Sequence, residues 1–296
     1  EFGKQIPVCN DENIPLNATQ QRMWYVEQLE EGTRVHSLPG SWAVPEGTNL
    51  DQLEKAFGKI ISNNEVMRLY VDDSQGMPIQ RHAAVEHDLK IPRRQFKTRE
   101  EAVAYMVERS QEPIDISSFP LFILEILEVK GGKAVIYFNK HHMIWDGWSV
   151  DLFLDKLNRY YNDLNDKHDL SLTRYRDYGV WADTRKKGQE YQNDLKYWIE
   201  QFDVLPKKLE FPSNMPQPEE LGSSAVSCEA KMESETLKKL EAFNKTHGIT
   251  DFMFFVGCYY LFLTQKSGNK DIVIGTPMRG RKLKELDEVL LSLIHI

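Results

Sequence analysis

The chain has 296 residues, a formal net charge of −8 and 41% hydrophobic residues, which describes one large domain or two ordinary domains of a water-soluble globular protein. The acidic balance argues against a nucleic-acid partner, which usually leaves a basic surface, and the longest apolar run, residues 252–263, is too short to span a membrane. The three cysteines have no paired spacing, so we expect neither a disulfide framework nor a zinc site, and a cytoplasmic location fits best.

Hydrophobic periodicity predicts alternating helices and strands in the first part of the chain. The clearest helix covers residues 49–62, and two β-rich runs around Lys130-Gly131-Gly132 predict a hairpin. Thr98 with Glu101 forms a capping pattern that opens a further helix. The full set is helices over 17–30, 49–62, 98–109, 149–164, 178–186 and 191–202, and extended segments over 35–44, 66–71, 121–129 and 133–139.

A proline-rich stretch, residues 205–222, is predicted to be a linker between two lobes. Beyond it, the sequence predicts a strand near 225–230, helices over 235–246 and 251–265, and a strand over 271–274. The aromatic side chains of 251–265 are expected to be buried helix core. Strands and helices alternate without long separate blocks, which predicts a mixed α/β (α+β) architecture.

The last six residues, 291–296, match a translation of CTG TCT CTT ATA CAC ATC, a transposase mosaic-end adapter used in preparing sequencing libraries. We therefore expect that these residues do not belong to the natural protein, and that His295 has no role. A natural apolar strand is the alternative.

The strongest chemical pattern lies just after the predicted hairpin, where a strand has ended and a helix has not yet begun. Polar side chains at such a place can face a cleft while the strands hold them rigidly. Adjacent strand residues point to opposite faces, so two neighbouring histidines are expected to differ in role. The ordinary alternative is a buried histidine pair before an Asp-Gly turn, and a metal site is disfavoured because no third ligand is evident. The residues are His141, His142, Met143, Ile144, Trp145, Asp146, Gly147, Trp148 and Ser149.

This run contains HHxxxDG, and so resembles the signature of the condensation domains of nonribosomal peptide synthetases, which belong to the chloramphenicol acetyltransferase-like superfamily. Four further segments resemble family motifs in the same order, although residues 17–24 and 63–68 depart from the family pattern at several positions. A Gly-x-Phe-x-Asn motif of the family is missing, so the resemblance covers a domain truncated in its second lobe. The four segments are 17–24, 63–68, 175–181 and 274–281.

The resemblance implies two chloramphenicol acetyltransferase-like lobes, the second incomplete. Residues 13–204 would form the N-terminal lobe with interlobe helices, 223–290 a partial C-terminal lobe, and 1–12 a linker. The implied reaction is amide formation between a carrier-bound donor acyl or peptidyl thioester and an acceptor aminoacyl thioester. Both substrates are carried on the 4'-phosphopantetheine arms of upstream and downstream peptidyl carrier domains, with an adenylation domain adjacent. No cofactor, nucleic acid or membrane is expected, and the fragment alone is predicted to be inactive.

The resemblance also assigns roles to five residues. His142 is expected to position the acceptor amine and take its proton, and the Gly147 N–H to help polarise the reacting groups. Asp146 is expected to hold the loop through an ion pair with Arg68, and His141 to be structural. Three alternatives stay open: a related O-acyltransferase, an epimerisation domain, and a non-catalytic condensation-like module that recruits other proteins.

Overall fold

A computed structural model of the chain describes residues 6–11, 13–30, 32–74, 76–85, 90–207, 209, 228–278, 280–281 and 283–292. Its internal contacts divide the chain into two compact units, one of residues 1–192 with 277–296 and the other of residues 193–276. The segment that follows the second unit therefore packs with the first one. Most of the predicted linker 205–222 lies outside the described residues.

Eighteen elements are described, and most of the predicted helices and strands are among them. In chain order they are β1 (Ile14–Pro15), α1 (Ala18–Leu29), β2 (Ser37–Ala43), α2 (Leu50–Asn63), η1 (Glu65–Arg68), β3 (Leu69–Asp72), β4 (Ile79–His82), β5 (Arg93–Phe96), α3 (Arg99–Arg109), β6 (Phe122–Val129), β7 (Val135–His141), α4 (Gly147–Asn162), η2 (His168–Ser171), α5 (Tyr175–Lys186), α6 (Gln189–Gln201), α7 (Ser234–His247), α8 (Asp251–Ser267) and η3 (Lys284–Leu286).

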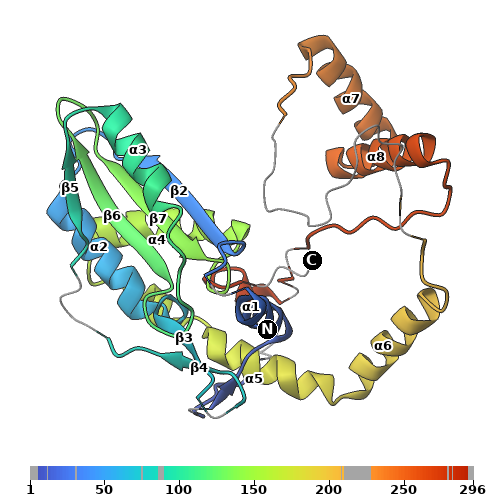
Figure 1. Ribbon diagram of the computed structural model, residues 1–296, viewed down its shortest axis with the longest axis horizontal. Coiled ribbons are helices and arrows are strands. Elements are labelled where there is room, and N and C mark those ends of the chain that lie inside the picture. The colour runs from blue at the N-terminus through green and yellow to red at the C-terminus, as the bar shows by residue number, and fades with distance from the viewer. Residues whose placement is uncertain are drawn as a thin grey trace. The chain divides into compact units, whose positions relative to one another are not determined.

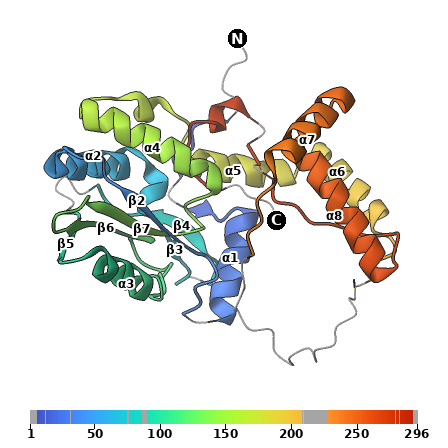
Figure 2. The same ribbon diagram turned by 90° about the horizontal axis from the view of Figure 1, so that it is seen from above.

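The first unit is built on a four-stranded sheet of order β2-β7-β6-β5 (Figure 1). The predicted hairpin is confirmed, because β6 and β7 pair antiparallel, with Phe122 opposite Lys140. Helices α2 and α4 cover one face of this sheet and α3 covers the other, which gives three layers (Figure 2). A smaller sheet of order β1-β4-β3 lies in the same unit.

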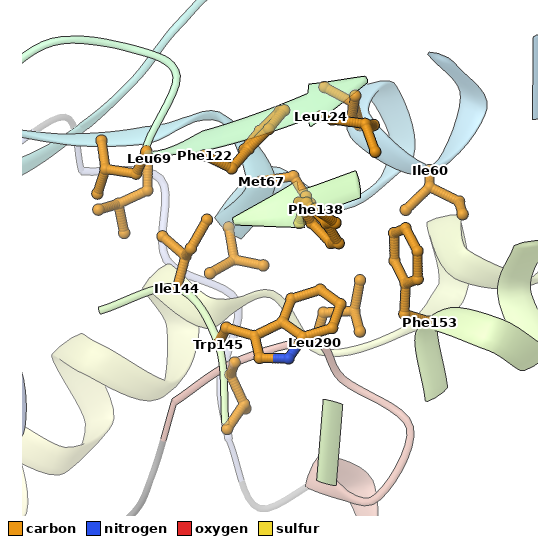
Figure 3. Close-up of a cluster of buried hydrophobic side chains, with 14 of the residues drawn as sticks. Ile60, Met67, Leu69, Phe122, Leu124, Phe138, Ile144, Trp145, Phe153 and Leu290 are labelled. Atoms are coloured by element: carbon orange, nitrogen blue, oxygen red, sulfur yellow. The ribbon is translucent and has the colours of Figure 1, made fainter. Parts of the chain in front are cut away.

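The core of the first unit lies between the sheet and the helices α2 and α4. Alternate residues of β7 face this side, and the Phe138 ring lies 5.1 Å from those of both Trp145 and Phe153. Figure 3 shows these side chains meeting Ile60 from α2 and Leu290 from the last described segment. The residues just after His142 are thus anchored in the core, which fixes the loop that follows β7.

Three predicted elements differ in the structure. The strand predicted over 66–71 begins only at Leu69, because the Met67 N–H donates to the Asn64 carbonyl (3.0 Å) and closes the turn of η1. No strand forms over 271–274, where the described residues provide no ladder partner. Of the strand predicted near 225–230, only 228–230 is described, and it is not a strand.

The expectation that the aromatic side chains of α8 are buried core is wrong for the described structure. Phe252 is 60% exposed, Tyr259 51% and Phe262 50%. Cys258 on the same helix is also exposed. The helix forms as predicted, but none of the described residues covers this face. Across the described chain, no helix combines the length and the apolar character that crossing a membrane would require.

Candidate active site

The site begins where β7 ends at His141. The chain turns sharply there, because the Ile144 N–H donates to the His141 carbonyl (3.2 Å) and the Trp145 N–H to the His142 carbonyl (3.4 Å). The His142 N–H donates to the carbonyl of His36, just before β2, at 2.8 Å. The backbone of His142 is therefore held from both sides before α4 starts at Gly147.

The His142 imidazole is half-buried. Its Nδ1 lies 3.2 Å from the hydroxyl of Ser292, and its Nε2 has no hydrogen-bond partner among the described residues. The imidazole is thus a partly accessible group that still has one nitrogen able to bind a substrate.

Asp146 is buried, with 1% of its surface exposed, and is the N-cap of α4. Its Oδ1 accepts from the N–H (2.9 Å) and the hydroxyl (2.8 Å) of Ser149. One nitrogen of Arg281, Nη2, lies 3.3 Å from each of its carboxylate oxygens. With this set of donors the carboxylate holds the loop to the start of α4 and to Arg281.

The predicted ion pair between Arg68 and Asp146 is wrong. Arg68 instead donates to the carbonyl of Ala83, and its charged neighbours are Glu65 and Arg176. Burial and the charge of Arg176 lower the pKa of Arg68 from its ordinary value, although Glu65 opposes that shift. The cation beside Asp146 is Arg281, which also donates to the Val289 carbonyl at 2.7 Å.

The sequence contains signals that could have identified Arg281 as the partner of Asp146. A buried carboxylate needs a cation, and the segment 274–281 already resembled a family motif. The resemblance, however, assigned the ion pair to an arginine from the other end of the chain. Sequence spacing does not reveal that the segment after the second unit returns to the first unit.

Gly147 is exposed and is the first residue of α4. A methyl group at its Cα would meet no atom within 4 Å, so the space beside it is open. Its N–H is one of the first in the helix, which have no acceptor within the helix. This N–H is therefore available to a group that enters the open space.

His141, in contrast, is 2% exposed and fully engaged. Its Nδ1 accepts from the Met143 N–H (3.0 Å), and its Nε2 lies 3.2 Å from Oε1 of Glu27. Burial lowers the pKa of His141, and the bond to Glu27 only partly offsets this, so the ring is neutral at pH 7. The sequence did not identify Glu27 as the partner of His141, because the pattern of the 17–30 helix does not show which of its side chains faces a histidine.

Glu27, His36 and His141 are close enough to share a metal ion, since one potential ligand atom from each lies within 4.8 Å of the others. The hydrogen bonds oppose this interpretation. Nδ1 of His141 accepts a hydrogen bond, so Nε2 carries the proton and is not a free ligand. The cluster is better described as two imidazoles bound to one carboxylate.

Two further sequence motifs meet near the loop. Asn17, the N-cap of α1, donates from Nδ2 to the hydroxyl of Tyr175 at 2.7 Å, which links the motif at 17–24 to the motif at 175–181. The two tryptophans of the loop differ: Trp145 is buried in the core, whereas Trp148 is exposed and donates from Nε1 to the Asp287 carbonyl (3.0 Å). Most of the motifs recognised in the sequence therefore converge on one unit.

The family model for the condensation domain matches residues 10–290. One of the plipastatin synthase subunits from Bacillus subtilis (strain 168) is 29% identical over 286 residues, which cover 96% of this chain and 11% of that protein. Bacitracin synthase 3 of Bacillus licheniformis is 26% identical over 275 residues, and the match covers 93% of this chain and 4% of that protein. The chain thus spans a small part of the length of these curated relatives.

Solved structures share the fold. The X-domain in a complex with OxyB from teicoplanin biosynthesis superposes with a TM-score of 0.82 at 18% identity, covering 97% of this chain and 65% of that one. The first condensation domain of the CDA synthetase gives 0.75 at 17% identity, covering 95% and 69%. The predicted mixed α/β fold of the chloramphenicol acetyltransferase-like type is confirmed.

Proposed function

This chain belongs to the condensation-domain family, and from that premise we propose that it forms amide bonds between two carrier-bound thioesters. The donor is an acyl or peptidyl thioester and the acceptor is an aminoacyl thioester. The acceptor nitrogen bonds to the donor carbonyl carbon, the carbon–sulfur bond breaks, and the proton lost by nitrogen ends on the departing thiol. The reaction balances without an oxidant, a reductant or a resident cofactor.

His142 is the residue that we assign to the acceptor amine. Its imidazole is half-exposed and its Nε2 is unpartnered among the described residues, while the backbone around it is fixed by hydrogen bonds and by the core. This combination of a rigid backbone and an available ring nitrogen is the observation that carries the proposal. A neutral imidazole can orient the amine, take its proton near pH 7 and pass it to the thiolate.

Asp146, Gly147 and His141 support that chemistry in different ways. Asp146 holds the loop through Arg281 and Ser149. The Gly147 N–H at the start of α4 would donate to the oxyanion that forms as the amine attacks, because the helix dipole favours negative charge there. His141 acts behind the loop rather than on the substrate. We assign no part in the reaction to Arg68, which lies in a separate charged cluster.

The partners implied by this reaction are peptidyl carrier domains on either side and an adjacent adenylation domain, with 4'-phosphopantetheine arms delivering both substrates. One relative in fold, a four-domain nonribosomal peptide synthetase, is 16% identical, and this chain covers 22% of it. A cytoplasmic setting completes the proposal, because these substrates are made and used there.

The test uses the condensation domain completed from its gene, with donor and acceptor thioesters on their carrier domains. We expect His142→Ala to slow amide formation roughly 10²–10⁴-fold in a single turnover followed by mass spectrometry, since positioned acid–base groups contribute that much. His247→Ala, the same change on an exposed face of α7, is the control and should leave the rate unaltered.

Amine and alcohol acceptors are compared side by side. Ester formation alone would favour the O-acyltransferase alternative, and inversion of the donor stereocentre without any new bond would favour the epimerisation domain. Retained carrier binding with no product from any acceptor would favour a recruiting module. An unchanged amide rate in His142→Ala would remove this imidazole from the mechanism.

A further inference from the structure

A carboxylate on α1 lies next to two imidazoles that flank the half-buried His142 in the chain or hold its backbone. Oε1 of Glu27 is 2.9 Å from Nδ1 of His36 and 3.2 Å from Nε2 of His141. The two imidazoles meet edge to face, with ring centroids 5.5 Å apart. A single oxygen atom thus binds two histidine rings that come from different segments.

Each of these histidines has a second contact that leads to the active-site loop. The ring of His141 accepts the Met143 N–H at 3.0 Å, which fixes the turn on the far side of His142. The carbonyl of His36 accepts the N–H of His142 itself at 2.8 Å. The two histidines on Glu27 therefore hold the backbone around His142 from both sides, His141 through its ring and His36 through its carbonyl.

The hydrogen bonds also determine where the proton of His141 sits. Because Nδ1 is an acceptor, a neutral ring must carry its proton on Nε2, and that proton points at Glu27. A ring protonated on Nδ1 would face the Met143 N–H with a second donor and open the turn. The acceptor that selects the correct tautomer is Glu27.

Burial alone would raise the pKa of Glu27, but its bonds to His141 and His36 outweigh that effect and the net pKa is lowered. The carboxylate stays ionised at neutral pH, as an acceptor for two N–H donors should.

We propose that Glu27 is a positioning residue for His142, acting through the tautomer of His141 and the placement of His36. This rests on the proposed function only in that His142 is the group to be positioned. An orienting carboxylate behind a histidine sharpens the placement of the ring next to the substrate, and a displacement of about 1 Å at a reacting group can cost roughly 10²-fold in rate.

The experiment compares Glu27→Leu and Glu27→Gln in the completed domain. Leucine offers no acceptor, so we expect the maximal single-turnover rate to fall about 10–100-fold, with the carrier concentration for half-maximal rate unchanged. Glutamine keeps a carbonyl oxygen for both imidazoles and should restore most of the rate. Glu30→Leu, an exposed change three residues along from Glu27, is the matched control and should leave the rate unaltered.

A double-mutant cycle separates positioning from general damage to the fold. If Glu27 acts through His141, Glu27→Leu should cost clearly less in a His141→Asn background than in the unaltered domain. Additive losses, or an equal loss in Glu30→Leu, would overturn the proposal, as would a folded Glu27→Leu domain with an unchanged rate.

Nitrogen NMR of ¹⁵N-histidine-labelled domain gives a reading that does not depend on activity. We expect His141 to show a protonated Nε2 in the unaltered domain and in Glu27→Gln, and to lose this signature in Glu27→Leu, with the His142 ring resonances shifted as well. Unshifted His141 and His142 signals in Glu27→Leu would overturn the proposal. If the unaltered domain made no amide, the proposed function would fail, and these signals would still decide the role of Glu27.

Discussion

Lys140 is an unusual side chain, because it is only 5% exposed and faces aromatic rings. Its Nζ lies 5.2 Å from the ring centroid of Phe138, 5.3 Å from that of Trp42 and 5.5 Å from that of Trp145. The hydrogen bond that its Nζ makes, at 3.4 Å, is to the Phe138 carbonyl. Burial lowers the pKa of Lys140 from 10.5 to about 8. Attraction to the aromatic faces offsets only part of the cost of burying this charge.

We expect the free energy of unfolding to rise between pH 8 and pH 10.5 on account of Lys140. The unfolded chain binds the Lys140 proton more tightly than the folded chain does. The free-energy cost of burying the charged Lys140 is therefore fully present below pH 8, and it disappears as the folded group and then the unfolded group deprotonate. Lys140→Met should remove this slope and raise stability at pH 7 by roughly 1–3 kcal/mol.

Urea unfolding at a series of pH values, read as the difference between variant and unaltered domain, measures this effect. Lys55→Met, at an exposed position on α2, is the control and should leave the slope in place. If the free energy of unfolding changed with pH in parallel for Lys140→Met and the unaltered domain, Lys140 would not be the titrating group.

At the scale of residues, the sequence predicted which residues lie together in the loop after β7, but not which side-chain atoms from elsewhere in the chain contact them. His142, Asp146 and Gly147 lie together because they are adjacent in the chain. The partners Glu27 and Arg281 come from segments far apart in the chain. Only the folded chain shows that Glu27 lies beside the buried His141 ring and that Arg281 pairs with the buried Asp146. The error over Arg68 has the same origin: the family resemblance paired Arg68 with Asp146, whereas the folded chain places Arg281 beside Asp146.

At the scale of elements, a buried ionic network joins α4 to η2 and to the end of α2. The side chain of Asp169 is fully buried, and it accepts from Lys156 Nζ (2.6 Å), Asn64 Nδ2 (2.8 Å) and Arg159 Nη2 (3.0 Å). Burial alone would raise the pKa of Asp169, but the attraction and bond of Lys156, with the other donors, outweigh it and lower the net pKa.

We expect Asp169→Asn to lower the free energy of unfolding by about 3–5 kcal/mol, because Lys156 would stay buried without an anion. Asp155→Asn, at an exposed carboxylate of the same helix that lies 3.3 Å from Nε of Arg159, is the control and should cost about 0.5 kcal/mol or less. Thermal unfolding measures both.

Acid should have a related effect on this network. The folded pKa of Asp169 is depressed. Its contribution to the free energy of unfolding is therefore present above pH 3.8 and is lost as the pH falls through the lower folded pKa. An equal loss of stability in the two variants, or an acid slope that persists in Asp169→Asn, would contradict this account.

Elements with strong local patterns were the predictable ones. The apolar spacing of α2 and the glycines between β6 and β7 determine those elements from nearby residues. The strand predicted over 271–274 depends on a ladder partner, which local sequence does not reveal. The boundary between η1 and β3 likewise follows from a turn at Asn64 and not from apolar content.

At the scale of the whole molecule, the second unit exposes an apolar stripe on α8. Phe252, Phe255, Tyr259 and Phe262 recur at helical spacing and are each 49–60% exposed. A contiguous apolar patch of this kind marks an interaction or aggregation surface.

We therefore expect the chain of 296 residues, on its own, to self-associate as its concentration rises. The double variant Phe255→Ser/Phe262→Ser should reduce this association in sedimentation velocity, whereas Val107→Ser, which removes one of the exposed apolar side chains of α3, should not. A monodisperse monomer at all concentrations would contradict the prediction.

The Arg281–Asp146 pair has a consequence for how the protein is made. The two residues are separated by 135 positions, so a ribosome synthesises Asp146 well before the arginine that neutralises its charge. Until then a carboxylate destined for burial has no cation, a state that costs about 3–5 kcal/mol in a finished fold. The nascent first unit can form its sheet and helices early, but Asp146 should lack its cation until the segment after the second unit has left the exit tunnel. The order of synthesis thus sets when the ion pair that holds the end of this loop can form.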